Sequence, residues 1–526
     1  MNIAEILAAR AADCPNDVAI LDASGRGERS ITFAELDRAA ARCATLLEQN
    51  GLRFGDAVLV FQPMSAELYV ALLAVFRLGL IAMFLDPSAG REHMERCCAL
   101  HPPRGFIAGT RAHLLRLFSP ALRRIPRKFV IGLPVPGAVR WQRADSLAPR
   151  TPIETVSPET PALLTFTSGS TGQPKAAVRS HGFLVAQHRA LADSLHLTPG
   201  EIDVATMPIV LLANLASGVT SLIPSVDLRH PGSIDPVPLI AQVRKHKAVS
   251  SVASPAFFER LTRHCVDRGL TLPSFTKLFT GGAPVFPRLL ERMQAMAPAA
   301  DVVAVYGSTE AEPIAHISHR DMSEADHRLM LAGKGLLAGL PVAAIQLRIL
   351  RDSWGRPVGP FDAEGFDSHC LSAGQPGEIV VNGGHVLPGY LHGQGDEETK
   401  FRVDGAVWHR TGDAGYLDDT GRVWLLGRCT ARIEDDRGIL YPFAAETAVY
   451  QDARVRRAAT IAHRGRRILA VTFYPSSVPV DLTALKTSLA WTQLDEIRVF
   501  PDLPVDKRHN AKIDYPSLLR MVDRSH

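Results

Sequence analysis

Hydrophobic and polar positions follow two alternating periods along the first part of the chain. Residues 32–47 place apolar side chains at helical spacing, and Thr32 with Glu35 three residues later predicts a capping box at its start. The apolar run 57–61 predicts a buried strand, and a helix predicted at 65–79 leads into another short strand. Strands that are apolar throughout are typical of parallel sheets covered on both faces. This order therefore predicts α/β layers.

The pattern changes beyond about residue 340. Over 161–260 it still predicts strand, Gly-rich turn, helix, strand and helix in succession. After residue 340, strand-like segments are separated by Gly, Pro and Asp turns, at 343–350, 377–383 and 422–427. These segments predict a β-rich subdomain. The polar and charged stretch 428–440 is then a candidate hinge.

We therefore expect an α/β protein with two domains of unequal size. The chain of 526 residues is long enough for more than one sizeable core. The larger domain is predicted at 1–427, with its β-rich subdomain at about 340–427, and a small, mobile α+β domain at 428–526. In this last domain the pattern predicts strands near 457–462 and 467–473, a helix near 481–490 and a strand near 496–500.

Composition and charge narrow the class of protein. Hydrophobic residues make up 46% and charged residues 21% of the chain, which is ordinary for a globular protein, and a net charge of +4 does not indicate nucleic-acid binding. The basic run 123–128 is interpreted as solvated surface. The most apolar helical stretch, 69–86, is interrupted by Arg77, which favours a buried helix over a membrane span.

Two further features bear on where the protein acts. Seven cysteines are scattered without a C-x-x-C pair, which is typical of a reduced, cytoplasmic protein. The N-terminal segment lacks a basic region followed by an apolar core, so no signal peptide is predicted.

The first candidate for chemistry is TFTSGSTGQPK at 165–175. An apolar strand enters a loop whose glycines permit close backbone approach, while its hydroxyls, backbone N–H groups and a lysine can surround phosphate oxygens. The residues concerned are Thr167, Ser168, Gly169, Ser170, Thr171, Gly172 and Lys175. The spacing differs from a Walker A loop. The alternative is a flexible Ser/Gly loop.

The second candidate is DVVAVYGSTEAEP at 301–313, again a strand that enters a Gly-Ser-Thr turn. The turn ends in Glu310, and Mg²⁺ prefers one or two carboxylates together with phosphate oxygens. Tyr306 can stack on a base. Taken alone, Glu310 can equally be an acid at a helix N-terminus.

Two later stretches carry further charged candidates. In 408–428, Asp413 is predicted in a tight Thr-Gly-Asp turn before a hairpin, and Arg428 stands at the candidate hinge. A carboxylate in this position can accept hydrogen bonds from both hydroxyls of a ribose. Taken singly, Asp413 is also typical of an Asx turn, and Arg428 of a surface charge. In 504–515 a polar loop carries Lys507, Arg508, His509 and Lys512, and Lys512 alone lies between apolar neighbours.

Together, in this order, the four stretches resemble the acyl-adenylate-forming superfamily, which includes acyl-CoA synthetases, firefly luciferase and nonribosomal adenylation domains. The resemblance runs from residues 31–61 to Lys512. It implies a large N-terminal domain, a mobile C-terminal domain and a reaction in two steps. A carboxylate attacks the α-phosphate of ATP to give an acyl-AMP and pyrophosphate, and a nucleophile then takes the acyl group.

The resemblance also implies a role for each candidate residue. The loop 167–175 would hold the β- and γ-phosphates, Glu310 would bind Mg²⁺, and Lys512 would bridge the carboxylate and the α-phosphate as a catalytic residue. Asp413 and Arg428 would bind the ribose. Tyr306 would pack on the adenine, near Gly281 and Gly282 of the stretch FTGGAP at 279–284. Further candidates for contacts with the nucleotide are Ala283, Gly307, Ser308 and Thr309.

Departures from the family pattern point to a subgroup. The stretch 207–218 lacks a histidine that is usual there, the hinge carries Thr430 and Glu434, and the last motif reads RHNAKI. Glu312 and Leu340 also depart from the usual residues. The forms FTGGAPV, YGSTEAEP and RHNAKI, together with the predicted helix in SSVASPAFFERL at 250–261, are most similar to the β-lactone synthetases of bacterial long-chain olefin biosynthesis.

The subgroup resemblance implies that a 3-hydroxy fatty acid is activated and that its own hydroxyl closes a lactone, with partner enzymes of the same pathway by analogy. A CoA requirement stays open. The alternatives are a fatty acyl-CoA or acyl-carrier-protein ligase and, in another class, an inactive adenylate-binding regulatory protein. In every case we expect a small-molecule carboxylic acid as the partner, with no nucleic acid and no membrane span.

Overall fold

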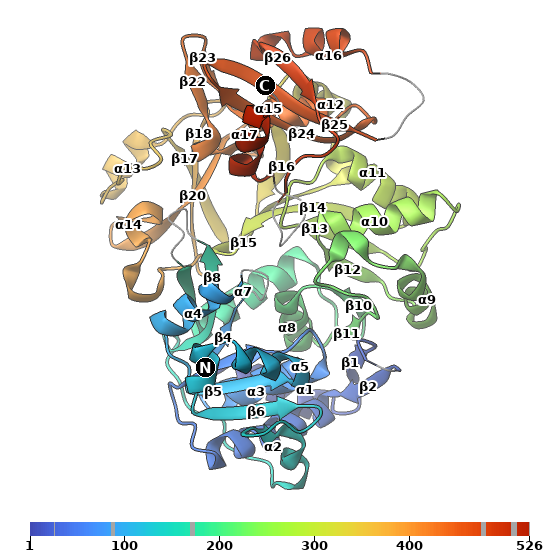
Figure 1. The fold of residues 1–526 in the computed structure, drawn as a ribbon, viewed down its shortest axis with the longest axis vertical. Coiled ribbons are helices and arrows are strands. Elements are labelled where there is room, and N and C mark those ends of the chain that lie inside the picture. The colour runs from blue at the N-terminus through green and yellow to red at the C-terminus, as the bar shows by residue number, and fades with distance from the viewer. Residues whose placement is uncertain (26, 86–89, 169–173, 475–479, 506–512, 525–526) are drawn as a thin grey trace. The chain divides into compact units, whose positions relative to one another are not determined.

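The computed structural model describes residues 1–25, 27–85, 90–168, 174–474, 480–505 and 513–524. The chain forms two compact units (Figure 1). The first consists of Met1–Leu228, Val237–Val252 and Leu387–Asp396, and the second of Arg229–Pro236, Ala253–Val386 and Glu397–His526. The predicted domain boundary between residues 427 and 428 stays a prediction.

The first unit is built on parallel strands, as the apolar runs predict. One sheet has the order β7 (Val139–Arg140), β6 (Arg127–Ile131), β5 (Gly105–Gly109), β3 (Ala57–Phe61), β4 (Ile81–Phe84), β8 (Pro161–Ser168) and β9 (Pro174–Ser180). The other strands of the unit have the order β12 (Ser250–Ala253), β10 (Ile202–Ala205), β11 (Thr220–Ile223), β1 (Val18–Asp22) and β2 (Arg29–Thr32). Among the described strand pairs of these sheets, β8–β9 and β1–β2 are antiparallel and the others are parallel.

The helices of this unit are α1 (Ile3–Asp13), α2 (Phe33–Gln49), α3 (Ala66–Arg77), α4 (Arg91–Leu100), α5 (Thr110–His113), α6 (Pro120–Arg124), α7 (His181–Ser194), α8 (Pro208–Ser217) and α9 (Pro236–His246). The predicted capping box of α2 is present, since Thr32 and Glu35 each accept a hydrogen bond from the other's backbone N–H. Arg77, at the end of the apolar helix α3, is buried in an ion pair with Asp37 at 2.6 Å. No helix in the described part of the chain is long and apolar enough to cross a membrane.

The second unit begins with the parallel pair β13 (Lys277–Gly281) and β14 (Asp301–Ser308). Its sheet continues antiparallel in the order β15 (Ala311–Ser318), β16 (Leu336–Pro341), β21 (Val423–Arg428), β20 (Ala406–Leu417), β18 (Gly377–Gly383) and β17 (Ile345–Leu350), and β19 (Lys400–Val403) also pairs with β20. Its helices up to this point are α10 (Pro255–Val266), α11 (Pro287–Met296), α12 (Glu324–Leu331), α13 (Ala363–His369) and α14 (Asp396–Thr399). The strands predicted at 343–350, 377–383 and 422–427 are present as β17, β18 and β21, and the β-rich subdomain stays a prediction.

The C-terminal part of this unit has a small sheet of its own, β24 (Val455–His463), β25 (Arg466–Phe473) and β26 (Glu496–Val499). Its helices are α15 (Pro442–Val449), α16 (Leu482–Ser488) and α17 (Tyr515–Arg524). The sequence prediction missed α15, α17 and the short hairpin β22 (Ile433–Asp435) and β23 (Gly438–Leu440), which lies in the candidate hinge. With both units combining helices and sheets, the fold class is α/β, as predicted.

Candidate active site at the strand ends of the second unit

The carboxyl ends of β13 and β14 meet at one edge of the sheet. The two strands are parallel, with Gly281 opposite Val305, and a Cβ on Gly281 would lie only 2.6 Å from the Val305 carbonyl oxygen. Gly282 then takes a φ of +82°, a conformation that favours glycine. The Gly281–Ala283 and Tyr306–Thr309 segments therefore leave adjacent strand ends, where open α/β sheets bind their ligands.

Glu310 lies in the tight turn of a hairpin. β14 pairs with β15 so that Ser308 is opposite Ala311, which leaves Thr309 and Glu310 between the strands. The alternative of an acid at a helix N-terminus is therefore wrong. Glu310 is half-buried, and the Ser308 hydroxyl is buried without a hydrogen-bond partner among the described residues. Such a hydroxyl has capacity left for a ligand.

Asp413 is presented by a bulge in a strand. Thr411, Gly412 and Asp413 belong to β20, so the predicted tight turn is wrong at this point. Opposite β18, Glu378 pairs with Ala414 and Val380 with Arg410, so β20 carries extra residues between them. Gly412 has a φ of +68°, which suits glycine. Bulges of this kind redirect a side chain at the edge of a site.

The carboxylate of Asp413 is held from two sides. The Tyr306 hydroxyl donates to its Oδ2 at 2.8 Å, and Arg428, directly opposite on β21, lies 3.2 Å from its Oδ1. Burial and the neighbouring Asp413 raise the pKa of the Tyr306 phenol well above its usual value, and Asp413 raises the pKa of Arg428. The tyrosine therefore stays a donor and the arginine a cation, with 54% of the Arg428 side chain exposed.

A buried histidine that the sequence analysis did not single out lies on the same strand. His409 is 3% exposed, and its Nδ1 is 3.1 Å from both the Lys400 ammonium and the Thr399 carbonyl oxygen. Burial, together with Lys400, lowers the pKa of His409 to about 3, while the charge of Glu310 acts in the opposite direction. The ring is therefore neutral at physiological pH. Its only sequence signal is its place four residues before Asp413.

The predicted phosphate loop belongs to the first unit. The backbone of Thr167 and Ser168 ends β8, and Lys175 lies on β9, opposite Thr167. The loop therefore joins two strands, whereas the pattern over 161–260 predicted a helix next. The Lys175 ammonium lies 5.9 Å from the centre of the Tyr390 ring, and a Cβ on Gly395 would meet the Lys175 side chain at 2.6 Å. Tyr390 and Gly395 were not predicted.

Several predicted residues lie outside the described part of the chain. These are Gly169, Ser170, Thr171 and Gly172 of the loop and Lys507, Arg508, His509 and Lys512 near the C-terminus. Their roles stay predictions. A cavity of about 480 Å³ in the second unit is lined by other residues, among them Tyr416, Trp424, Tyr441 and Trp491.

Comparison with known proteins decides the family. The family model described as AMP-binding enzyme matches residues 7–391. The olefin β-lactone synthetase of Stenotrophomonas maltophilia is 31% identical over 543 aligned residues, which cover 97% of this chain and 96% of that protein. The chain belongs to the AMP-binding enzyme family. It is an acyl-adenylate-forming ligase, as its motifs predict.

Other members of the family are also similar. The indoleacetate–CoA ligase of Aromatoleum aromaticum is 26% identical, over 84% of this chain and 82% of that protein. The crystal structure of ATP-bound MatB from Rhodopseudomonas palustris superposes with a TM-score of 0.80 at 21% identity, over 99% of this chain and 98% of that one. The fold is therefore that of adenylate-forming enzymes.

Proposed function

We propose that this AMP-binding enzyme uses ATP to adenylate a 3-hydroxy fatty acid and then closes the acyl chain to a β-lactone. The observation that carries the proposal is the match to an olefin β-lactone synthetase along nearly the whole of both chains, at 31% identity against 26% for the CoA ligase. The departures at Thr430, Glu434 and the RHNAKI ending support it, because an intramolecular acceptor needs no thiol stage.

In the first step, a carboxylate oxygen of the acid bonds to the α-phosphorus of ATP, and the bond from that phosphorus to pyrophosphate breaks. The second unit supplies the nucleoside site. Asp413 is fixed between Tyr306 and Arg428 and, as an anion, accepts hydrogen bonds from ribose hydroxyls. The buried hydroxyl of Ser308 offers a further hydrogen bond to the nucleotide. The residues present therefore fit a nucleotide.

We assign the Mg²⁺ of this reaction to Glu310. Among the described residues, no three His, Cys, Asp or Glu side chains form a cluster that holds a metal ion unaided. A single carboxylate at a hairpin turn fits Mg²⁺, which takes its other ligands from phosphate oxygens and water. When bound, the ion would neutralise negative charge on the phosphates. Lys175, the loop 167–175 and Lys512 are assigned the remaining phosphate and carboxylate contacts.

In the second step, the oxygen of the 3-hydroxyl bonds to the acyl carbon, and the bond from that carbon to the AMP oxygen breaks. AMP leaves, and the hydroxyl proton passes to solvent. Because nucleophile and acyl carbon belong to one molecule, the effective concentration of the nucleophile is set by orientation alone. The four-membered lactone ring is strained. The free energy released when AMP leaves the acyl carbon offsets this strain.

The proposal is tested by incubating the enzyme with ATP, Mg²⁺ and 3-hydroxydecanoate, with and without CoA. We expect the enzyme to form pyrophosphate, AMP and lactone in the absence of CoA. ³¹P NMR detects pyrophosphate and AMP, and mass spectrometry detects the lactone. Decanoate is the matched control, since it lacks the hydroxyl and should support ATP–pyrophosphate exchange without lactone.

Each other outcome contradicts a stated part of the proposal. A product that forms only when CoA or an acyl carrier protein is present would make the chain a thiol ligase. Absence of exchange with every acid would contradict adenylation itself and favour a binding protein. Exchange that survives in a Lys512→Ala variant would remove the role assigned to Lys512.

A further inference from the structure

One segment of the first unit departs from the charge balance of the rest of the chain. Residues 96–144 contain ten Lys and Arg residues, and there is no Asp or Glu between Glu95 and Asp145. Since the whole chain carries +4, the remaining residues together carry −6. Taken alone, the basic run 123–128 within this segment is typical of solvated surface. The structure shows that basic side chains are only part of this surface.

Large apolar side chains are exposed in the middle of the same segment. α5, the 3-10 helix η2 (Leu114–Leu117) and α6 follow one another as short turns, and the loop after β6 carries one more exposed leucine. The exposed fractions are 57% for Leu114, 37% for Leu115, 69% for Leu117, 66% for Phe118 and 74% for Leu133. Single exposed leucines are ordinary, whereas a group of this kind marks an interaction surface.

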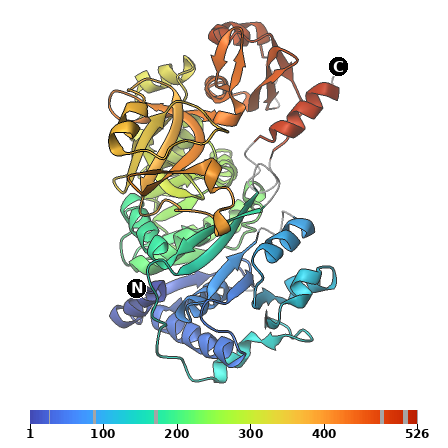
Figure 2. The same ribbon diagram turned by 90° about the vertical axis from the view of Figure 1, so that its left-hand side faces the viewer.

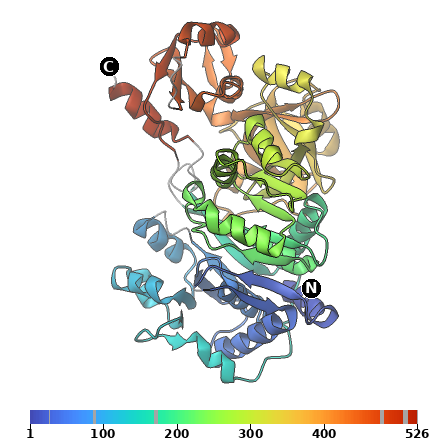
Figure 3. The ribbon, with the colours of Figure 1, turned by 90° about the vertical axis from the view of Figure 1, so that its right-hand side faces the viewer.

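These side chains are held on one well-connected piece of structure. The Thr110 hydroxyl donates to the Leu133 carbonyl oxygen at 3.0 Å, and Arg116 donates to the Pro136 carbonyl oxygen at 3.2 Å, so the loop after β6 lies beside α5 and η2. On the inner side, Leu122 and Ile125 are buried in the core. In Figures 2 and 3 the light-blue to cyan segment lies along one edge of the first unit.

Cations surround the apolar group without being neutralised. Arg111, Arg123 and Arg124 are exposed, and in the part of the chain that the structure describes none of them forms an ion pair with a carboxylate. The acid that precedes this segment, Glu95, is engaged, because its two oxygens accept from the Ser119 hydroxyl and the Ala121 N–H at the start of α6. Arg123 donates only to the backbone carbonyl oxygens of Arg116 and Leu117, which leave its charge in place. Guanidinium groups without a carboxylate partner, next to protruding apolar side chains, favour an anionic ligand with an apolar layer beneath it.

We propose that this surface docks the protein on bilayers that contain anionic lipids. We call it the 110–133 surface, and it consists of Arg111, Leu114, Leu115, Leu117, Phe118, Arg123, Arg124 and Leu133. Apolar side chains that enter the headgroup region, flanked by Lys or Arg that contact lipid phosphates, are the two components of reversible binding to a membrane surface. Leu114, Leu115 and Leu117 stand on η2 with Phe118 directly after it, and Leu133 stands on the adjoining loop. Such a small protruding group suits a fluid layer better than a shaped protein ligand.

The docking proposal is independent of the proposed reaction, since none of these residues belongs to the candidate active site. If the substrate is a fatty acid, docking would place the enzyme where such acids dissolve. Loss of membrane binding should therefore leave adenylation of a water-soluble acid unchanged, and a failure of either proposal can be recognised without the other.

The test is co-sedimentation with vesicles at about 0.1 M salt, where surface charges are not yet fully screened. We expect binding to phosphatidylcholine vesicles that contain phosphatidylglycerol and little binding to phosphatidylcholine alone. Two variants separate the components, Arg111→Glu/Arg124→Glu and Leu117→Ser/Phe118→Ser. Val266→Ser/Arg268→Glu, which alters an exposed apolar residue and an exposed arginine in the second unit, is the matched control.

Arg111→Glu/Arg124→Glu should lower the partition coefficient on anionic vesicles at least about tenfold, because each Lys or Arg near such a surface contributes on the order of 1 kcal/mol. Leu117→Ser/Phe118→Ser should also lower it, because the binding strength scales with the apolar area that enters the headgroup region. The control should bind as the unaltered protein does. Unchanged melting temperature and ATP–pyrophosphate exchange show that the variants are folded. Absence of binding to anionic vesicles, or equal binding by all variants, overturns the proposal. Self-association that is lost only in Leu117→Ser/Phe118→Ser, without vesicle binding, also overturns it and assigns the surface to a second copy.

Discussion

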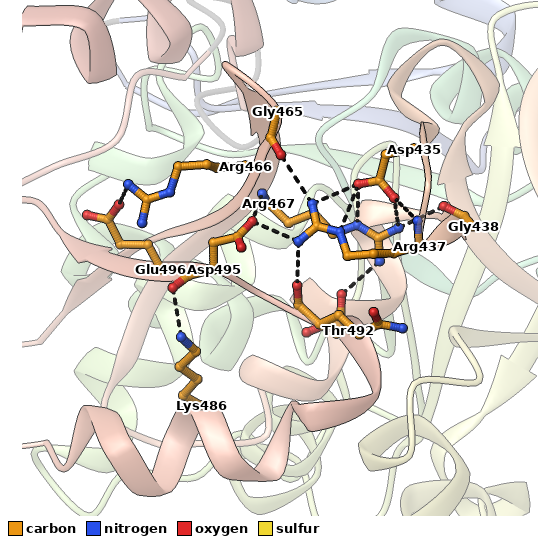
Figure 4. Close-up of polar contacts among 11 residues, drawn as sticks. Asp435, Arg437, Gly438, Gly465, Arg466, Arg467, Lys486, Thr492, Asp495 and Glu496 are labelled. Carbon is orange, nitrogen blue, oxygen red and sulfur yellow. Dashed lines mark hydrogen bonds and ion pairs between the residues drawn. The ribbon is translucent and has the colours of Figure 1, made fainter.

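Two Asp–Arg clusters in the second unit have a similar composition. They differ in how many of their charged and polar groups can still bind a ligand. At the strand ends, Asp413 contacts Tyr306 and Arg428, and the Arg428 side chain is 54% exposed. In the C-terminal part, Asp435 pairs with Arg467, whose side chain is 3% exposed (Figure 4). An arginine that is half exposed can still bind a ligand, whereas a buried one is committed to the protein.

The C-terminal cluster is saturated by its own residues. Arg467 donates to both carboxylate oxygens of Asp435, at 2.9 and 2.6 Å, and to the carbonyl oxygens of Gly438 and Thr492. Arg437 donates to Asp435 and to Asp495. The network therefore ties the β22–β23 hairpin to β25 and to the segment before β26. An Asp–Arg pair thus indicates function only where nearby hydrogen-bond donors or acceptors are unused. The first cluster has such a group, the buried hydroxyl of Ser308.

The largest expected effect is the loss of nucleotide binding in Asp413→Ala. This change removes a carboxylate that we assign to two ribose hydroxyls, each bond to a charged group contributing on the order of 2 kcal/mol, so kcat/KM for ATP should fall at least about a hundredfold. ATP–pyrophosphate exchange measures it, with the melting temperature as a check on folding. Asp419→Ala, an exposed aspartate in the next hairpin, is the control. Equal exchange in the two variants would contradict the assignment of Asp413.

Asp435→Ala should show the opposite behaviour. The change leaves the buried Arg467 without its carboxylate, and breaking a pair in this way is strongly destabilising. We expect thermal unfolding of this part to begin about 5 °C lower or more, with exchange activity per folded molecule unchanged. Asp436→Ala, the exposed neighbour in the same turn, should leave the melting temperature unaltered. If Asp435→Ala melted normally but lost exchange, the division between the two clusters would be wrong.

Local patterns predicted most of the fold. Thr32 and Glu35 predicted the start of α2, and the apolar run between glycines at 377–383 predicted β18 with its observed bounds, because these signals lie within the elements themselves. β9 was missed, since residues 174–180 become a strand only through pairing with β8. The turn predicted at Asp413 is a bulge for a similar reason, as its geometry depends on the register with β18.

The sequence predicted individual residues of the candidate site. It did not predict which of these residues contact one another. Motifs named Tyr306, Asp413 and Arg428 separately, yet the hydrogen bond from Tyr306 to Asp413 joins residues 107 positions apart. His409 was missed because a lone histidine in a strand gives no signal until burial lowers its pKa. Long-range packing therefore supplied what local sequence lacked.

A carboxyl group with no arginine gives a third case for the comparison. Glu446 on α15 is 4% exposed, and its Oε1 accepts from the Thr460 N–H and the Tyr515 hydroxyl. Burial raises the pKa of Glu446 to about 7. Between its usual pKa and 7, the folded state holds a proton that the unfolded state has released. Stability therefore falls as pH rises through this window, and the loss is complete above it.

Glu446→Gln should remove this pH dependence. Glutamine keeps an acceptor for Thr460 and Tyr515 and carries no charge, so the variant should be more stable than the unaltered protein at pH 8, by about 3 kcal/mol, and similar to it at pH 5. Urea unfolding at the two pH values measures the difference. Glu434→Gln, whose side chain is 63% exposed, should show no such change. A variant with the same pH profile as the unaltered protein would mean that Glu446 ionises as a surface carboxyl does.

The smallest expected effect distinguishes two roles of Tyr306, the hydrogen bond from its hydroxyl to Asp413 and the packing of its ring on adenine. Tyr306→Phe keeps the ring and removes one hydrogen bond to Asp413, while Arg428 still holds the other oxygen. Loss of one bond to a charged group should raise KM for ATP roughly tenfold, with kcat retained, because the carboxylate stays in place but is less well oriented. Tyr306→Leu also removes the ring. If the ring packs on adenine, this variant should raise KM for ATP further than Tyr306→Phe does. Equal KM values in the Phe and Leu variants would reject ring packing, and an unchanged KM in Tyr306→Phe would show that Arg428 alone orients Asp413.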